Sequence, residues 1–235
     1  MKPKSVKTGA FTGVALALLL AAVSPARAQE AKTPYPHMAP LEQYLMPDRT
    51  AEILLARSAA PESISRDAQV LVLGRLGYET AVKGTNGFVC LVERSWDQGI
   101  EGSEFWNPKV RSPFCLNAAA ARFYLPRTFK RTALILAGRS KGQMFDVLKA
   151  AVAGNELPAP EPGAVCYMMS KQGYLNDRDG HWHPHLMFYF SNMDPATWGA
   201  NLPGSPVIAI EQPEERLITF LVPVRRWSDG TPDLP

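Results

Sequence analysis

The chain contains few cysteines and few histidines: three and four, respectively, among 235 residues. In an oxidising compartment an odd number of cysteines leaves one thiol unpaired within the chain, or pairs it between chains. Cys90 and Cys115 would close a loop of modest length, and we expect a disulfide between them. Cys166 then stays free, and we expect a small buried hydrophobic side chain there rather than a reactive or metal-bound thiol.

The sequence also lacks a complete catalytic signature. It contains no Gly-x-Ser-x-Gly elbow, no Ser-x-x-Lys, no His-Glu-x-x-His, no phosphate-binding Walker loop and no dinucleotide-binding fingerprint. The segment NDRDG resembles a calcium-binding loop, but Leu186 stands where the closing glutamate of an EF-hand is required. A polar turn is the better interpretation, and the sequence names no catalytic residue.

Only one apolar run is long enough to matter for targeting, and it lies at the N-terminus. Basic residues (Lys2, Lys4 and Lys7) precede the run at 11–23, which is shorter than the ~20 residues that span a bilayer. Ala26-Arg27-Ala28 then matches a small-x-small cleavage site. These features predict a signal peptide over residues 1–28, rather than an uncleaved anchor, and a secreted or periplasmic protein. No later segment is apolar enough to be a transmembrane span.

The apparent basic charge comes from this leader. The whole chain has 25 Lys and Arg residues against 22 Asp and Glu residues, but residues 1–28 hold four of the basic residues and no acidic one. The remaining chain has a formal charge of −1. This balance gives no reason to expect nucleic acid or an anionic membrane as a partner.

Hydrophobic periodicity predicts an α+β fold, with a mainly antiparallel sheet of about six to seven strands and two to four helices packed on it. Asn86-Gly87 predicts a hairpin between the second and third strands, Asp48 a helix N-cap, Ser140 with Gln143 a capping box, and Gly154 a left-handed C-cap. The expected helices span 48–60, 126–138 and 140–155, and the expected strands 68–74, 77–84, 88–94, 163–170, 183–190, 205–210 and 216–224.

The same pattern sets the expected domain organisation. Residues 29–47 are proline-rich and predict an extended N-terminal arm, and residues 48–235 predict a single α+β domain. The stretch 95–114 has no periodicity, so we expect a long loop there, in which Trp96, Phe105 and Trp106 form a small apolar cluster of their own.

Four segments carry a resemblance to other proteins: GTNGFVCLV, YMMS, HWHPHLMFYF and the terminal WSDGTP. Together they resemble an uncharacterised group of secreted bacterial proteins, over most of the chain that follows the leader. The resemblance implies secretion and brings no activity, ligand or catalytic residue with it.

The stretch GHWHPHLMFYF holds the residues that could carry chemistry. His181, His183 and His185 alternate with apolar residues, so in a strand the apolar side chains should face the core and the histidines a cleft or solvent. Two imidazoles ~6.6 Å apart can lean onto one ion, with His37 as the only other histidine available. Zinc or copper would suit such ligands. Asp229, in WSDGTP, is a further candidate, although Ser-Asp-Gly is also typical of a turn.

Three hypotheses follow from the sequence. The histidine-lined cleft binds a transition metal; or the protein is a non-catalytic module that binds a small molecule or a peptide; or the histidines are purely structural. Whether the protein is an enzyme stays open.

Export can be tested directly. If residues 1–28 are a signal peptide, N-terminal sequencing of the exported protein should begin at Gln29 or within a residue or two of it. Recovery of the chain with Met1 intact, in the cytoplasmic fraction alone, would contradict this prediction.

Overall fold

A mixed sheet of eight strands forms the centre of the structure, a computed structural model that describes residues 34–97, 102 and 104–234. All neighbouring strands are antiparallel except β1 and β3, which are parallel. In spatial order the strands are β2 (Gly77–Val82), β1 (Gln69–Gly74), β3 (Val89–Glu93), β4 (Ser112–Leu116), β5 (Val165–Met168), β6 (His185–Phe190), β8 (Leu217–Pro223) and β7 (Ile208–Gln212).

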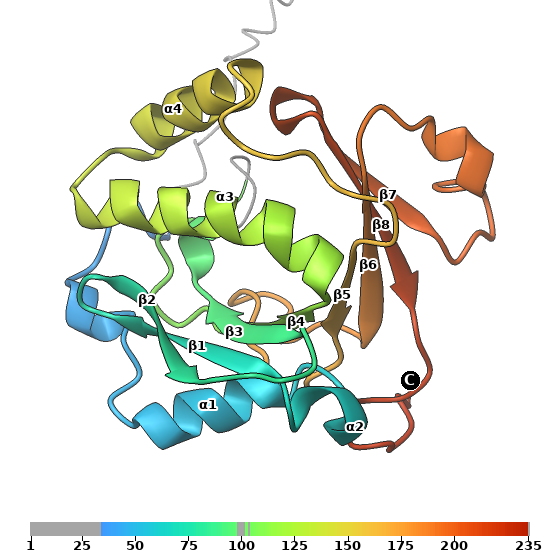
Figure 1. The fold of residues 1–235 in the computed structure, drawn as a ribbon, viewed down its shortest axis with the longest axis horizontal. Coiled ribbons are helices and arrows are strands. Elements are labelled where there is room, and N and C mark those ends of the chain that lie inside the picture. Colours follow the sequence, from blue (N-terminus) through green and yellow to red (C-terminus); the bar gives the residue numbers. More distant parts are fainter. Residues whose placement is uncertain (1–33, 98–101, 103, 235) are drawn as a thin grey trace, which may run out of the picture. The chain divides into compact units, whose positions relative to one another are not determined.

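Helices cover both faces of the first half of this sheet (Figure 1). Helix α1 packs against β1, β3 and β4, whereas α3 lies over the opposite face and contacts β2, β4 and β5. Helix α4 packs on α3. The α helices are α1 (Arg49–Arg57), α2 (Glu62–Ser65), α3 (Ala118–Leu136) and α4 (Lys141–Ala153), and the 3₁₀ turns are η1 (Leu41–Gln43), η2 (Ser95–Asp97), η3 (Pro195–Trp198) and η4 (Pro213–Glu215). The α+β prediction is therefore confirmed, with one strand more than expected.

Local capping signals placed two helices correctly. The Asp48 side chain accepts from the Thr50 amide at the start of α1, and the reciprocal Ser140–Gln143 capping box opens α4. The predicted left-handed C-cap is wrong by one residue, because Gly154 has φ −79° and Asn155 takes the positive φ of 58°. Asparagine tolerates this conformation better than most residues do.

The predicted hairpin at Asn86-Gly87 is wrong. Strands β1 and β2 form the hairpin, and the following loop crosses back so that β3 pairs with β1 in parallel. Gly84 makes this crossing feasible, since a Cβ at that position would lie 2.1 Å from the Gln69 amide nitrogen. The Asn86 side chain accepts from the Phe88 amide and donates to the Ile64 carbonyl. The Asn86 side chain therefore stabilises a crossover loop, although the Asn-Gly sequence of this loop is also typical of a hairpin turn.

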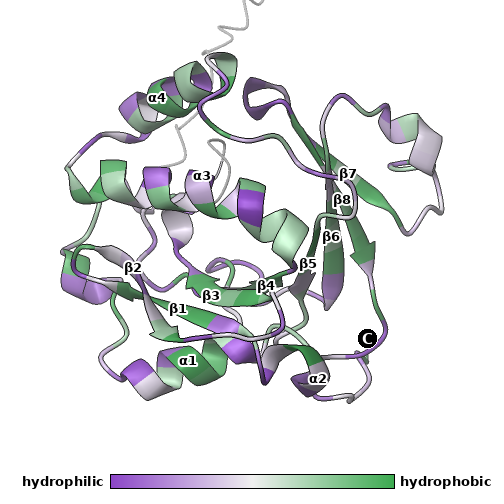
Figure 2. Ribbon diagram, viewed as in Figure 1, coloured by the Kyte–Doolittle hydropathy of each residue, from purple (hydrophilic) through white to green (hydrophobic). Residues whose placement is uncertain are grey.

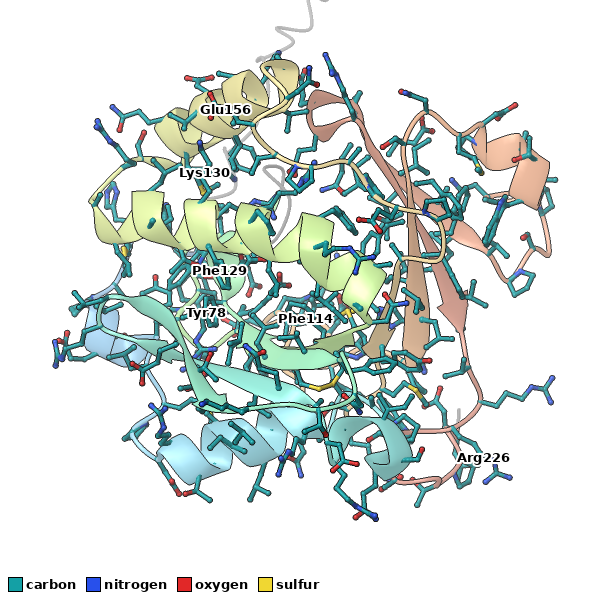
Figure 3. All side chains as sticks on the ribbon, viewed as in Figure 1. Tyr78, Phe114, Phe129, Lys130, Glu156 and Arg226 are labelled. Carbon is teal, nitrogen blue, oxygen red and sulfur yellow. A yellow bond between two sulfur atoms is a disulfide. The ribbon has the colours of Figure 1, made fainter. Side chains whose placement is uncertain are left out.

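Two further boundaries differ from the prediction. Strand β4 begins inside the stretch 95–114 that was expected to be loop. Each of its five residues is buried, so it shows no alternation of polar and apolar residues. Helix α3 begins at Ala118, capped by Asn117, and Pro126 lies within the helix instead of starting it. Lys130 of α3 then pairs with Glu156, just after α4, at 3.1 Å (Figure 3).

The two faces of the sheet bury separate apolar clusters. Cys90 and Cys115 stand directly opposite each other on β3 and β4 and form the predicted disulfide on the α1 side. Cys115 pairs with Tyr167 and shares its face of the sheet. The residue before Tyr167, Cys166, therefore points to the other face, where it is buried as the predicted free thiol. Disulfide exchange between Cys166 and the bridge would require the sheet to open.

The outer edge of β7 is closed by a side chain. Asn201 donates to the Ala209 carbonyl and accepts from the Ala209 amide, at 3.1 and 3.0 Å. These two bonds replace the pairing that a further strand would provide. At this position they leave no free backbone groups with which another chain could pair.

The residues before α1 pack onto the domain. Tyr44 is fully buried, its ring lies 4.9 Å from that of Trp96, and its carbonyl accepts from Arg94 Nε at 2.7 Å. Trp96 and Phe105 belong to the same cluster as Tyr44 and α4, so the stretch 95–114 does not form the separate apolar cluster that we expected. Within the described ranges, no helix is long and apolar enough to cross a membrane.

Candidate functional site

The histidine-rich segment reaches the sheet only at its end. Strand β6 begins at His185, so His181 and His183 precede it. His181 is exposed, with its ring 6.0 Å from that of Trp227. His183 is also exposed, and its Nδ1 lies 2.7 Å from a carboxylate oxygen of Asp233. Both histidines therefore lie against the C-terminal segment.

His185 contradicts the predicted orientation, because its side chain is buried with the core. Its Nδ1 donates to the carbonyl of His183 at 2.7 Å, and burial lowers the pKa of the imidazole. The expectation that one face of this strand is open failed because both faces of β6 are covered. Tyr189 packs on Phe123 of α3, whereas Phe190 packs on Phe220 and Trp198.

The metal hypothesis gains no support from this arrangement. Among the residues that the structure describes, which include all four histidines, no group of three or more His, Cys, Asp or Glu side chains could hold a metal ion. A ligand set for zinc or copper is not brought together there. His37 lies in another part of the molecule, against α3 and α4.

The other two candidates are explained by local structure. Burial raises the pKa of the Cys166 thiol well above its usual value, so the thiolate that a nucleophile needs is disfavoured. Asp229 accepts from the hydroxyl and the amide of Thr231 and pairs with Lys171, and these contacts lower its pKa to about 2. The interpretation of this segment as a turn is thus sufficient.

A cavity of about 510 Å³ lies where the N-terminal arm meets the connection between α3 and α4. The arm contributes Pro36–Met38, α3 contributes Ile135, and the remaining wall is made by Trp106 and residues 138–143. Pockets for small molecules typically measure ~300–1,000 Å³. Of the predicted site residues, only His37 lines this cavity.

The lining combines apolar and basic side chains. Trp106, whose ring centroid is 4.6 Å from that of Phe105, and the buried Ile135 provide apolar surface. Arg139 and Lys141 provide positive charge, His37 adds an imidazole, and the described lining has no acidic side chain. Lys141 also donates to the Gly102 carbonyl and lies over the Phe105 ring. The cavity can thus hold an apolar group beside an anionic one.

A second group of polar residues, which the sequence analysis missed, lies between α3 and the sheet. It includes Glu93 and Asp97 near the end of β3, Arg127 and Arg131 of α3, and Glu215 of η4, and all of them are buried. Hydrophilic positions recur along α3 in Figure 2. The signal was present in the sequence, since Arg127 and Arg131 are one helical turn apart and share a face with the apolar Phe123 and Ile135.

Comparison with protein-family models, curated proteins and solved structures finds no match for this chain. Its function therefore rests on the chemistry of its own residues.

The buried imidazole generates a testable pH dependence. Because the pKa of His185 is lower in the folded chain, the unfolded chain binds the extra proton, and this contribution to stability is lost as the pH falls below about 6.5. In His185→Gln, whose amide can still donate to the His183 carbonyl, this loss should disappear. Each unit of pKa difference is worth about 1.4 kcal/mol of unfolding free energy.

Urea unfolding between about pH 5 and pH 8 measures the effect. His181→Gln, which changes an exposed histidine, serves as the matched control and should follow the wild type. An identical pH dependence in wild type and His185→Gln would show that His185 is not held neutral by burial.

Proposed function

We propose that this protein is an exported, non-catalytic binding protein for a small amphipathic anion, an apolar molecule that carries a carboxylate or sulfonate group. The observation that carries the proposal is the cavity of about 510 Å³, with its apolar wall and its basic residues. A cavity of this size and chemistry fits one small ligand, and it lies between the arm on one side and α3 and α4 on the other.

The sign of the ligand charge follows from the lining. His37, Arg139 and Lys141 are basic, and no carboxylate among the described lining residues would attract a cation. Arg139 is exposed and offers a planar fork of donors that matches a carboxylate or sulfonate. Trp106 and Ile135 favour an apolar body, because burying apolar surface contributes ~25 cal/mol per Å².

The leader supports the exported location. Residues 1–28 have the charge and hydrophobic pattern of a signal peptide. The disulfide between Cys90 and Cys115 is typical of an oxidising compartment. A binding protein in such a compartment would meet its ligand outside the cytoplasm.

Anilinonaphthalene sulfonate is a suitable probe, because it joins apolar aromatic rings to one anionic group. We predict that the folded protein binds one molecule and enhances its fluorescence. Arg139→Glu should weaken binding roughly 10-fold or more, which corresponds to about 1.4 kcal/mol or more. Gly142→Leu should weaken it as well by filling the cavity, because a Cβ at Gly142 meets no atom within 4 Å.

Two controls make the result specific. Lys83→Glu makes the same kind of charge reversal at an exposed residue outside the cavity and should bind like the wild type. Gly142→Leu should melt no lower than the wild type, since leucine favours a helix more than glycine does. If all four proteins bind the probe equally, the cavity is not its site and the proposal is wrong.

A further inference from the structure

The face that α3 turns toward the sheet is unusually polar for a buried helix face. Arg127, Thr128, Arg131 and Thr132 are each at most 4% exposed. Arginine is almost never fully buried unless it is paired. The positive charges of these arginines must therefore be balanced by the carboxyl groups that lie opposite this helix.

Glu215 pairs with both arginines. Its Oε1 accepts from Arg131, and its Oε2 lies 3.7 Å from Arg127 Nε, which is an ion-pair distance but too long for a hydrogen bond. Arg94 is committed elsewhere, to Glu52, in a pair whose side chains are 0% and 2% exposed. No ion pair joins Glu93 or Asp97 to any of the described basic residues at a distance within 4.0 Å.

A charge count gives the consequence. Glu93, Asp97 and Glu215 are three carboxyl groups, whereas Arg127 and Arg131 are two guanidinium groups, so full ionisation would leave one negative charge in the interior. A buried charge without a partner costs several kcal/mol, and buried acids avoid this cost by binding a proton. The arrangement therefore favours a proton on Glu93 or Asp97.

The contacts of the two side chains agree with this count. The Tyr124 hydroxyl lies beside Glu93, and Glu93 Oε1 has no hydrogen-bond partner among the described residues. Asp97 Oδ2 accepts a long bond from the Arg94 amide at 3.4 Å, and its Oδ1 likewise lacks a partner there. Neither carboxylate has the two or three donors that would stabilise its charge.

We propose that Glu93 and Asp97 form a buried carboxyl pair that binds a proton from solvent, and that loss of this proton at alkaline pH weakens the contact between α3 and the sheet. Burial raises the pKa of Asp97 to about 7, although the guanidinium of Arg131 opposes the shift. Burial, and then the charge of Asp97, raise the pKa of Glu93 well above its usual value. This site is separate from the proposed ligand cavity and does not depend on it.

The surrounding titratable groups do not replace the pair in this role. Burial raises the pKa values of Tyr78, Tyr124, Tyr189 and Cys166 well above their usual values, so these groups stay neutral near pH 7. The charged groups that act on the pair are Arg94, Arg131 and Glu215. Glu52 and Arg127 are the ion-pair partners of Arg94 and Glu215.

The direction of the pH effect follows from the raised pKa values. Unfolded Asp and Glu titrate near ~3.9 and ~4.3. Above this range the folded chain holds a proton that the unfolded chain has released, so the stability that the pair contributes falls as the pH rises through about 7.

NMR of the wild-type protein, with ¹³C-labelled Asp and Glu carboxyl groups, tests the proposal directly. The Asp97 carboxyl should titrate near pH 7, and that of Glu93 well above its usual value. Asp97→Asn and Glu93→Gln assign the signals and supply the second readout. Midpoints near ~4 for both groups would overturn the proposal.

Urea unfolding between about pH 5 and pH 8 provides that second readout. Asp97→Asn should lose the fall in stability that Asp97 contributes over this range, whereas the contributions of Glu93 and His185 remain. It should therefore become more stable relative to the wild type as the pH rises. Asp146→Asn, on the exposed surface of α4, is the matched control and should keep the fall. If Asp97→Asn fails to fold, the carboxyl titration of the wild type alone decides the proposal.

Discussion

The pairing of two buried arginines with Glu215 ties together parts of the chain that are far apart in sequence. Glu215 lies in η4, between β7 and β8, and pairs with Arg127 and Arg131 of α3. Arg127 also donates to the carbonyl of Pro158, in the segment after α4. Next to this pair, Lys149 of α4 contacts Glu214 at 2.5 Å. Removal of one partner from such a buried pair typically lowers the free energy of unfolding by about 3–5 kcal/mol, because the other charge is left buried without a partner.

The same helix links the interior to the proposed ligand cavity. Thr132, one residue after Arg131, accepts from the indole of Trp96, and Ile135 forms part of the cavity wall one turn further along. Trp96 in turn packs on Tyr44, which anchors the N-terminal arm that lines the other side of the cavity. The arm and α3 thus share one apolar cluster.

The sequence was informative where a signal is local. Asp48, Ser140 and Gln143 cap helices through contacts within a few residues, and the predicted disulfide between Cys90 and Cys115 is confirmed. Prediction failed where the outcome depends on distant contacts. The loop at Asn86-Gly87 is a crossover because β3 pairs with β1 in parallel. Strand β4 shows no alternation of polar and apolar residues because both its faces are covered.

The orientation predicted for the histidine segment was wrong for the same reason. Alternation predicted an open face, but the partners that bury His185 and Tyr189 come from other elements. The carboxyl groups opposite Arg131 were missed because β3 reads as an apolar strand up to Glu93. The cavity wall comes from the arm, Trp106, Ile135 and the α3–α4 connection, so only His37 was accessible to sequence reasoning.

The central claim is that the cavity between the arm, α3 and α4 binds an amphipathic anion. A crystal structure of the protein with bound anilinonaphthalene sulfonate tests it most directly. The account predicts that the rings lie against Trp106 and Ile135, with the sulfonate beside Arg139 or His37. A structure in which the probe occupies another surface, and the cavity holds none of it, would contradict the account.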